Sequence, residues 1–262
     1  MSVDVFRYVV NGLQVAMILY CIVRSLNGLR SQTHPLVSVF FALGLLCYFV
    51  NDLYWLTHLM MGKGAYPPFS ACDISAIGLY LLLSSALDVV FREDTRDVRV
   101  VTIPAVVFAA CNTALWIIWS GEWFQQIVSG LAFARLLSSS ARGLKCSGAL
   151  SRREWRFLAA ACGFLIPAEA VLPLLSGGVY KAVDLLCYGV MFGFMAFFLL
   201  RTIHEHRHGS SDAALGIAFA GYSWALVTLY LSAEPYYTVA DTIIILFIGL
   251  MLPAVRRKAA ET

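Results

Sequence analysis

Long uninterrupted apolar segments constrain this chain more than any other feature of its sequence. Residues 39–61, 101–120 and 157–175 each contain at most one Asp, Glu, Lys or Arg. A helix needs about 20 such residues to cross the roughly 30 Å hydrocarbon core of a bilayer. Backbone in lipid must pair its own polar groups, which limits spanning segments to helices and closed barrels. Because the apolar runs are continuous rather than alternating, the sequence predicts membrane-spanning α-helices.

The composition excludes an ordinary soluble fold. Of 262 residues, 60% are hydrophobic and 13% are charged, whereas soluble domains average about 45–50% and about 25%. We therefore predict an all-α polytopic transmembrane helix bundle, with residues 1–262 forming a single integral membrane domain. The loops between the apolar runs are too short for a soluble domain, so a kinase, a cyclase or a DNA-binding unit is not expected, and nucleic acid is not an expected partner.

Apolar runs and their breaks predict nine spans. They cover about residues 4–26, 35–61, 69–91, 100–120, 122–141, 155–176, 179–202, 212–232 and 236–255. The first run lacks the charged start and the small-residue cleavage site of a signal peptide, so we expect it to remain as a span. An odd number of spans places the two termini on opposite sides of the membrane.

Lys and Arg are concentrated in alternate loops. One side carries Arg24, Arg30, Arg92, Arg96, Arg99, Arg142, Lys145, Arg152, Arg153, Arg156, Arg201, Arg207, Arg256, Arg257 and Lys258. The other side carries little beyond Lys63 and Lys181. Because basic loops are retained in the cytoplasm, we expect the N-terminus outside and the C-terminus inside, in a bacterial-type cytoplasmic (inner) membrane.

The hairpins that turn on the outer side share a pattern, in which an aromatic residue is followed four positions later by an acid near the start of an inward-running helix. The clear copies are Phe69 with Asp73, Tyr180 with Asp184, and Tyr237 with Asp241, and a degenerate copy is Glu122 with Gln126. This period suggests four duplicated two-helix units, about 35–91, 100–141, 155–202 and 212–255, preceded by an extra span at 4–26. Evenly spaced helices would produce part of the same regularity, so duplication and coincidence both stay open.

Ionisable residues inside spans cost about 2.5–3.5 kcal/mol at a helix centre, so each of them needs a physical reason. Asp73, Asp184 and Asp241 have one in the helix dipole, because a carboxylate near a helix start meets positive partial charge and caps free N–H groups. Asp52 and Glu169 lie near the outer ends of outward-running helices, where the dipole is unfavourable. Asp52 and Glu169 are therefore the stronger candidates for a functional role.

The surroundings of these two acids in the sequence also suggest a site. Asp52 continues a polar and aromatic stripe on the second span, formed with Tyr48, Trp55 and His58 at helical spacing. Glu169 lies between two prolines, whose missing N–H groups kink a helix and free its carbonyl oxygens. Such broken helices commonly line cavities inside a membrane bundle.

Other polar features are interpreted as packing. Asp73, Tyr80, Ser84 and Asp88 form a stripe on the third span that we expect to face the bundle interior. Arg135 is an embedded cation in the inner half of the fifth span. It could pair with Asp88, but snorkelling to anionic headgroups is the favoured interpretation.

The small residues and the possible metal ligands suggest no chemistry. Gly189 and Gly193 on the seventh span, and Gly216 and Ala220 on the eighth, are expected to form helix packing surfaces. The His-rich run at 204–208 is interpreted as a chance cluster in a basic loop. The seven cysteines show no spacing typical of zinc, redox or haem sites, so no metal or cofactor is expected.

The acids gather in the outer half of the predicted bundle, together with several Trp and Tyr side chains. These acids are Asp52, Asp73, Glu169, Asp184 and Asp241. Carboxylates with aromatic rings suit a cation, by charge or by cation–π contact, although Trp and Tyr also anchor membrane interfaces regardless of function. Our leading hypothesis is an outward-facing acidic and aromatic cavity in a sensor or carrier for a small cationic ligand, proton or ion, with Trp55 and His58 as further ligand-binding candidates.

Two alternatives stay open at the level of the sequence. The first is an intramembrane enzyme that acts on a lipid, with Asp52 and either His58 or Glu169 as acid and base. The second is a scaffold subunit of a membrane complex, in which the polar stripes contact a membrane protein partner or a second copy of the chain. The lipid bilayer is an expected partner under every hypothesis.

Overall fold

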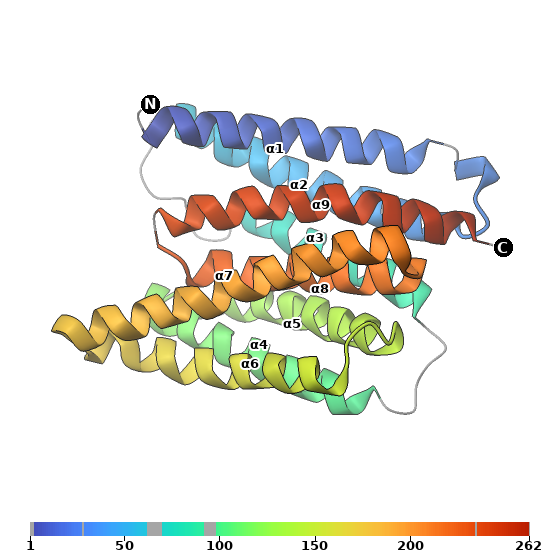
Figure 1. The fold of residues 1–262 in the computed structure, drawn as a ribbon. Helices are drawn as coiled ribbons and strands as arrows, with labels where there is room; N and C mark the ends of the chain where they lie inside the picture. The colour runs from blue at the N-terminus through green and yellow to red at the C-terminus, as the bar shows by residue number, and fades with distance from the viewer. Residues whose placement is uncertain (1–2, 28, 62–69, 92–97, 234, 262) are drawn as a thin grey trace.

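The structure, a computed structural model, describes residues 3–27, 29–61, 70–91, 98–233 and 235–261 (Figure 1). Within these residues it contains nine α-helices, two short 3-10 turns and no strand. The helices are α1 (Val3–Leu26), α2 (Pro35–Met60), α3 (Ala71–Val90), α4 (Arg99–Ser120), α5 (Trp123–Cys146), α6 (Arg152–Val171), α7 (Gly177–His208), α8 (Ser211–Leu231) and α9 (Tyr236–Ala260), and the turns are η1 (Leu29–Ser31) and η2 (Leu172–Leu174). The predicted all-α bundle is confirmed, and the predicted features at Lys63, Phe69, Arg92 and Arg96 lie outside the described residues.

Eight of the nine helices in the described residues are long and apolar enough to cross a membrane, which identifies a multi-pass membrane protein. The other helix is α5, whose second half carries Arg135, Arg142 and Lys145 together with a run of serines. It nevertheless runs along the bundle beside its neighbours (Figure 1) and packs against α3, α4 and α8. α5 is therefore a charged helix held within an otherwise apolar bundle.

The central helix of the bundle is α8. Nearly all of its side chains are buried, whereas each of the other seven apolar helices keeps a larger exposed share. Its many Ala and Gly residues explain this position, because small side chains let neighbouring helix backbones approach closely. A Cβ added at Gly216, for example, would lie 2.9 Å from the carbonyl oxygen of Gly143 on α5. α5, α7 and α9 all pack directly against α8.

The remaining helices surround this axis in two groups (Figure 1). α1, α2 and α9 pack against one another, and α3 joins this group to α5 by contacting both α2 and α5. α4 packs on α5, and α6 packs against α7 and α4 at the periphery. We name the end of the bundle that carries the C-terminus the inner end, and the opposite end, where α3, α5, α7 and α9 begin, the outer end.

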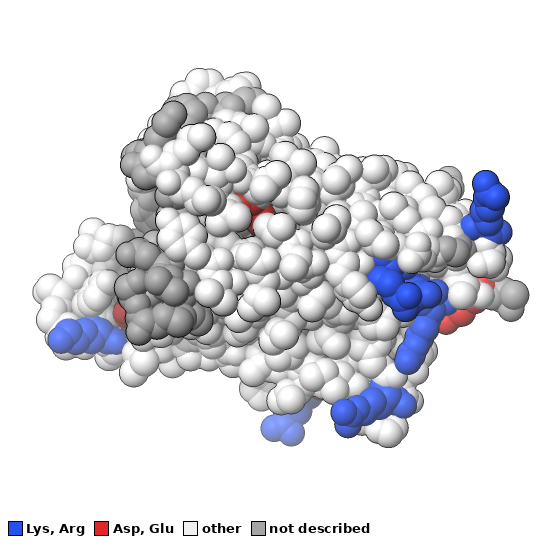
Figure 2. Space-filling view, turned by 90° about the horizontal axis from the view of Figure 1, so that it is seen from above, with Lys and Arg blue, Asp and Glu red and all other residues white. Residues whose placement is uncertain are grey.

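Charged side chains are found mainly toward the ends of the bundle. Most of the Lys and Arg visible in Figure 2 lie toward the inner end, and the flank of the bundle between the ends is almost uncharged in this view. An uncharged flank fits the apolar core of a bilayer, since a charged side chain there is costly. The basic inner end agrees with the loop charges on which the predicted orientation rests.

Two expectations about α7 are wrong. The His-rich run at 204–208 forms the last turns of α7 rather than a loop, because the helix continues to His208 and ends at Gly209. Gly189 and Gly193 do not form a packing surface with the rest of the chain, since a Cβ added at either would meet nothing within 4 Å. The close approach predicted around Gly216 is confirmed by its short distance to α5.

Gly221→Ala should destabilise the bundle. A Cβ at Gly221 of α8 would overlap the ring of Phe247 and would lie 2.9 Å from Cβ of Phe198. Overpacking of a filled core costs about 1–3 kcal/mol, so we expect a lower thermal unfolding midpoint (Tm) for the purified protein in nanodiscs. Gly189→Ala is the matched control and should leave Tm nearly unchanged, because its Cβ meets open space. Equal Tm values for the two variants would contradict the central position of α8.

Candidate functional site

An open pocket of about 330 Å³ lies at the outer end of the bundle, between α3, α4, α5 and α8. Its lining residues are Asp73, Ala76, Tyr80, Trp116, Trp119, Ser120, Gln125, Gln126, Ser129 and Tyr230. The volume is within the range of small-molecule sites, about 300–1,000 Å³. We name this feature the outer pocket.

Packed aromatic side chains form one wall of the outer pocket. The ring of Trp116 lies 4.9 Å from that of Tyr230 and 5.4 Å from that of Phe133, measured between centroids, and both ring pairs are tilted. The hydroxyl groups of Tyr80 and Tyr230 are hydrogen-bonded to each other, which fixes α3 against α8 at this level. Trp116 is buried, and its indole Nε1, itself buried, has no hydrogen-bond partner. The wall therefore offers a fixed aromatic surface.

The carboxylate of Asp73 is fixed at the pocket by the start of α3. Asp73 Oδ2 accepts hydrogen bonds from the backbone N–H of Ser70 at 2.8 Å and from Ser70 Oγ at 3.0 Å. This capping box is the usual way in which an acid at the third helical position stabilises a helix start. Both bonds go to Oδ2, so the charge is held in place while Asp73 also lines the pocket.

Two of the four equivalent positions of the predicted hairpin repeat meet in this pocket. Asp73 is the third residue of α3 and Gln126 is the fourth of α5, and both are lining residues. Asp241 is the sixth residue of α9 and Asp184 the eighth of α7, so neither lies in the first turn of its helix. The dipole and capping explanation is therefore strongest for Asp73, since Asp241 lies in the second turn of its helix and Asp184 just beyond the second turn. The duplication of the hairpins stays a prediction.

Asp52 belongs to a buried polar cluster inside the bundle. Only 5% of its surface is exposed, and its electrostatic neighbours are Asp241 of α9 and the amide of Asn51. Gln14 of α1 reaches the same place, where its Nε2 donates to the Tyr48 hydroxyl at 2.6 Å and to Asp241 Oδ1 at 3.2 Å. Two carboxylates from different helices therefore share one apolar region.

Tyr222 of the central helix completes this group, because both Asp52 and Asp241 interact with it electrostatically. We name Gln14, Tyr48, Asp52, Tyr222 and Asp241 the acid cluster. Three of its buried atoms, Gln14 Oε1, Asp52 Oδ2 and the Tyr222 hydroxyl, have no hydrogen-bond partner. Since buried polar groups are nearly always paired, the cluster has capacity for a proton or a small cation.

Side chains of α2 and α3 link the acid cluster to the residue that precedes Asp73. The thiol of Cys72 donates to Asn51 Oδ1, and Asn51 Nδ2 approaches Asp52 Oδ1 at 3.5 Å. Cys72 directly precedes Asp73, which lines the pocket. A chain of polar side chains therefore extends from the buried acid to the neighbour of a pocket residue.

Glu169 pairs with a different acid. It is 5% exposed on α6, accepts a hydrogen bond from the Cys187 thiol of α7, and interacts electrostatically with Asp184. α6 packs against α7 and α4, whereas α2 packs against α1, α3 and α9. Asp52 thus has Asp241 as its acidic neighbour, and Glu169 has Asp184. The structure places these two pairs of acids in separate parts of the bundle.

Trp55 and His58 continue α2 beyond Asp52 and are only half-buried. The imidazole of His58 stacks on Tyr54 of the same helix, with 6.5 Å between ring centroids and 18° between planes. Neither Trp55 nor His58 is among the lining residues of the outer pocket. The predicted stripe is therefore buried at Tyr48 and Asp52, whereas its later residues Trp55 and His58 are partly exposed.

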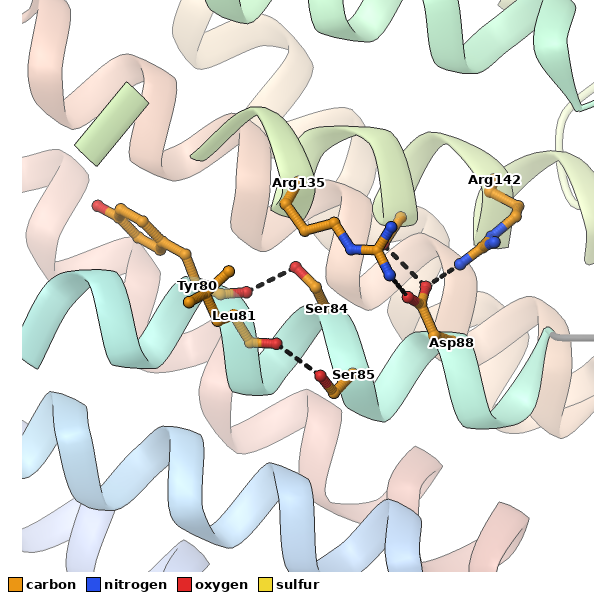
Figure 3. Close-up of polar contacts among 8 residues, drawn as sticks. Tyr80, Leu81, Ser84, Ser85, Asp88, Arg135 and Arg142 are labelled. Atoms are coloured by element: carbon orange, nitrogen blue, oxygen red, sulfur yellow. Dashed lines mark hydrogen bonds and ion pairs between the residues drawn. The ribbon is translucent and has the colours of Figure 1, made fainter. Parts of the chain in front are cut away.

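The expectation that Arg135 snorkels to the headgroups is wrong, because it pairs with Asp88 (Figure 3). Arg135 and Arg142 both project from α5 toward the Asp88 carboxylate of α3, and Ser139 Oγ adds a hydrogen bond to Asp88 Oδ1 at 2.9 Å. A carboxylate within reach of the guanidinium satisfies its charge without a path to the interface. The stripe on the third span faces the interior as expected, since Tyr80 and Ser84 are buried.

Several contributors to these sites were missed in the sequence. Gln14 was the most accessible of them, because an amide in the middle of an apolar span is itself an unusual residue. Tyr222 and Tyr230 give no such signal, since Tyr is common throughout membrane helices and their roles depend on the central position of α8. Which acid neighbours which depends on helix packing, and no local pattern carries that information.

The same substitution should have opposite effects at two acids inside the bundle. Asp88→Asn removes the charged partner of two arginines and should lower Tm, by less than the roughly 3–5 kcal/mol of a fully buried pair, because Asp88, Arg135 and Arg142 are partly exposed. Asp52→Asn removes one of two neighbouring carboxylates and should leave Tm unchanged or raise it, because like charges in an apolar region repel. The measurement is the Tm of both variants in nanodiscs of one lipid composition. A loss of stability for Asp52→Asn as large as that for Asp88→Asn would show that Asp52 is a structural partner instead.

Comparison of the chain with protein-family models, with curated proteins and with solved structures finds no match. The geometry of the outer pocket and the acid cluster is therefore the basis for a proposed function.

Proposed function

We propose that the protein is a sensor or carrier that binds a small organic cation in the outer pocket. The observation that supports this proposal is the chemistry of the pocket wall. Asp73 contributes a carboxylate, while Trp116, Trp119 and Tyr230 contribute aromatic rings. Neither Lys nor Arg is among the lining residues that the structure describes. The pocket therefore combines negative charge with aromatic surface and without a competing cation.

An ammonium group fits this wall better than a neutral or anionic ligand. A cation within about 6 Å of a Trp or Tyr ring face gains about 0.5–2 kcal/mol, with the larger values in water-poor sites. The carboxylate of Asp73 adds direct charge attraction, and its position is fixed by Ser70. The favoured class is thus a small organic ammonium compound.

The acid cluster extends this proposal from binding to response. It lies inside the bundle and is linked through Asn51 and Cys72 to the residue that precedes Asp73. Two neighbouring carboxylates in an apolar region share protons or a small cation rather than both remaining charged. A cationic ligand that binds at Asp73 would change the electrostatic balance of this cluster, and a sensor requires such a change. A coupled carrier would instead use the cluster to hold a proton or ion.

The lipid-enzyme alternative gains no support from the geometry. An acid and a base must both reach the same substrate atoms. The electrostatic neighbours of Asp52 are Asp241 and Asn51, and those of Glu169 are Asp184 and Cys187, so each acid lacks the proposed partner among these groups. His58 stacks on Tyr54 of the same helix.

The proposal includes an orientation in the cytoplasmic (inner) membrane, with the outer pocket facing outside and the basic inner end in the cytoplasm. A C-terminal fusion to a fluorescent protein that folds only in the cytoplasm should fluoresce in a bacterial host, because basic ends are retained inside. A fusion at the same position to a phosphatase that is active only outside should be inactive. The reverse result would place the outer pocket on the cytoplasmic side and would exclude an external ligand.

Choline is a suitable probe for the pocket, with its neutral isostere, in which carbon replaces nitrogen, as the matched ligand control. Binding to the folded state raises its stability by about 2.7 kcal/mol at a ligand concentration of about 100 Kd. Choline should therefore raise the Tm of the protein in nanodiscs, and the neutral isostere should not. Equal shifts for the two compounds would contradict a cation site.

Two variants test which residues hold the probe. Asp73→Asn keeps an acceptor for Ser70 but removes the charge, and Trp119→Ala removes a ring that is largely exposed at the pocket. Both should weaken the choline-dependent shift while the variants remain folded without ligand. Glu154→Gln is the control, since Glu154 forms the same capping box with Ser151 at the inner end. A shift that survives Asp73→Asn unchanged would exclude the outer pocket as the choline site.

A further inference from the structure

A second cavity of about 520 Å³ lies in the inner half of the bundle, between the peripheral helix α6 and the helices α4, α5, α7 and α8. The sequence of α6 leaves this space open, because Ala159, Cys162 and Gly163 present small side chains toward it. A Cβ added at Gly163 would meet nothing within 4 Å. We name this feature the apolar crevice.

The serine hydroxyls and the Trp224 indole of the crevice wall are already paired. Ser140 and Ser223 are hydrogen-bonded to each other at 2.8 Å, and Nε1 of Trp224 donates to the carbonyl oxygen of Met191 at 2.9 Å. The other lining residues are almost all apolar. A polar ligand would therefore gain little inside the crevice, whereas a hydrocarbon chain would fill it without leaving a buried polar group unpaired.

The crevice opens sideways, toward the region that the bilayer would occupy. Val100 and Val107 of α4 both line it, and they are 73% and 56% exposed. On α6 the lining runs from Trp155 to Pro167, which is about 18 Å along the helix axis. This length is slightly more than half of the roughly 30 Å hydrocarbon core, so the crevice is about one leaflet deep.

Basic side chains stand at the inner mouth of the crevice. Arg152 precedes Trp155 by three residues and therefore continues the lining face of α6 by one turn toward the inner end. Arg156 adjoins Trp155, and both arginines are exposed. Guanidinium groups bind phosphate oxygens in a bidentate manner, and Trp is typical of the depth at which lipid headgroups lie. Arg153 differs, since its guanidinium lies over the ring of Phe157, which is not a lining residue.

We propose that the apolar crevice is a binding site for an anionic phospholipid of the inner leaflet, with one acyl chain between α6 and α8 and the phosphate group at Arg152 and Arg156. The length, the lateral opening and the apolar wall fit an acyl chain. The two arginines at its mouth select a negative headgroup. This site is independent of the outer pocket, because it lies at the other end of the bundle and uses other residues.

The test uses the purified full chain, delipidated in detergent and mixed with equal amounts of phosphatidylglycerol and phosphatidylcholine carrying the same acyl chains. Native mass spectrometry counts the lipids retained by the folded protein. We expect phosphatidylglycerol to be retained in preference by about tenfold, since each Arg near the headgroup contributes to anionic binding. Equal retention of the two lipids would overturn the anionic site.

Variants separate the headgroup contacts from the acyl chain contacts. Arg152→Gln with Arg156→Gln should abolish the preference for phosphatidylglycerol, and Arg153→Gln, on the same helix, should preserve it. Gly163→Leu should fill the crevice and abolish retention of both lipids, whereas Gly189→Leu, at an equally open position on α7, should not. Ala159→Leu tests the same filling independently if Gly163→Leu fails to fold. Undiminished lipid retention in a folded crevice-filling variant would overturn the proposal. A wild-type dimer that dissociates in this variant would also overturn it, and would indicate that the crevice contacts a second copy of the chain.

Discussion

The burial of α8 on all sides is the constraint on which the rest of this structure depends. Between apolar helices in lipid there is little hydrophobic driving force, so association relies on close packing and hydrogen bonds. A helix surrounded by others must therefore present small residues in every direction, and α8 does so with Ala and Gly spread along its length. The same helix supplies part of the wall of the outer pocket, the acid cluster and the apolar crevice. Tyr230 faces the outer pocket, Tyr222 belongs to the acid cluster, and Ser223 with Trp224 closes the apolar crevice.

The acids of the bundle differ in what compensates for their charge. Asp73 is stabilised by the start of its own helix through Ser70, and Asp88 by Arg135 and Arg142 of the neighbouring helix. Both are therefore fixed charges, one at the mouth of a pocket and the other in an ion cluster. Asp52 and Glu169 have another acid as their electrostatic neighbour. Two neighbouring carboxylates do not stabilise a fold. Asp52 and Glu169, together with the outer pocket near Asp52, are therefore the stronger functional candidates.

The sequence predicted the helices well because apolar length is a local property. It also indicated Asp52 and Glu169 as unusual, since the direction of each helix can be deduced from the loop charges. The central position of α8 could not be deduced in this way, because burial on all sides and exposure to lipid both require apolar residues. The pairing of Arg135 with Asp88 was misjudged for a related reason. Snorkelling depends on the depth of Arg135 in the membrane, which the sequence indicates. Pairing depends on which helices are neighbours, which the sequence does not indicate. The aromatic side chains of the outer pocket were visible as residues near an interface, but their convergence on Asp73 depends on the packing of α3, α4, α5 and α8.

The outer pocket and the acid cluster differ in size and polarity, and under the function proposed above they would serve two stages of a response. The pocket is open and aromatic, so it suits an organic cation that keeps part of its hydration. The acid cluster is buried and holds partnerless atoms on Gln14, Asp52 and Tyr222, so it suits a bare proton or a small ion. A charge added at Asp73 would act on the cluster through a medium of low dielectric constant, where Coulomb interactions are much stronger than in water. Under the proposed function, a cation bound at the surface of the bundle would thus influence its interior without entering it, and a carrier would differ from a sensor only in letting an ion proceed from the pocket to the cluster.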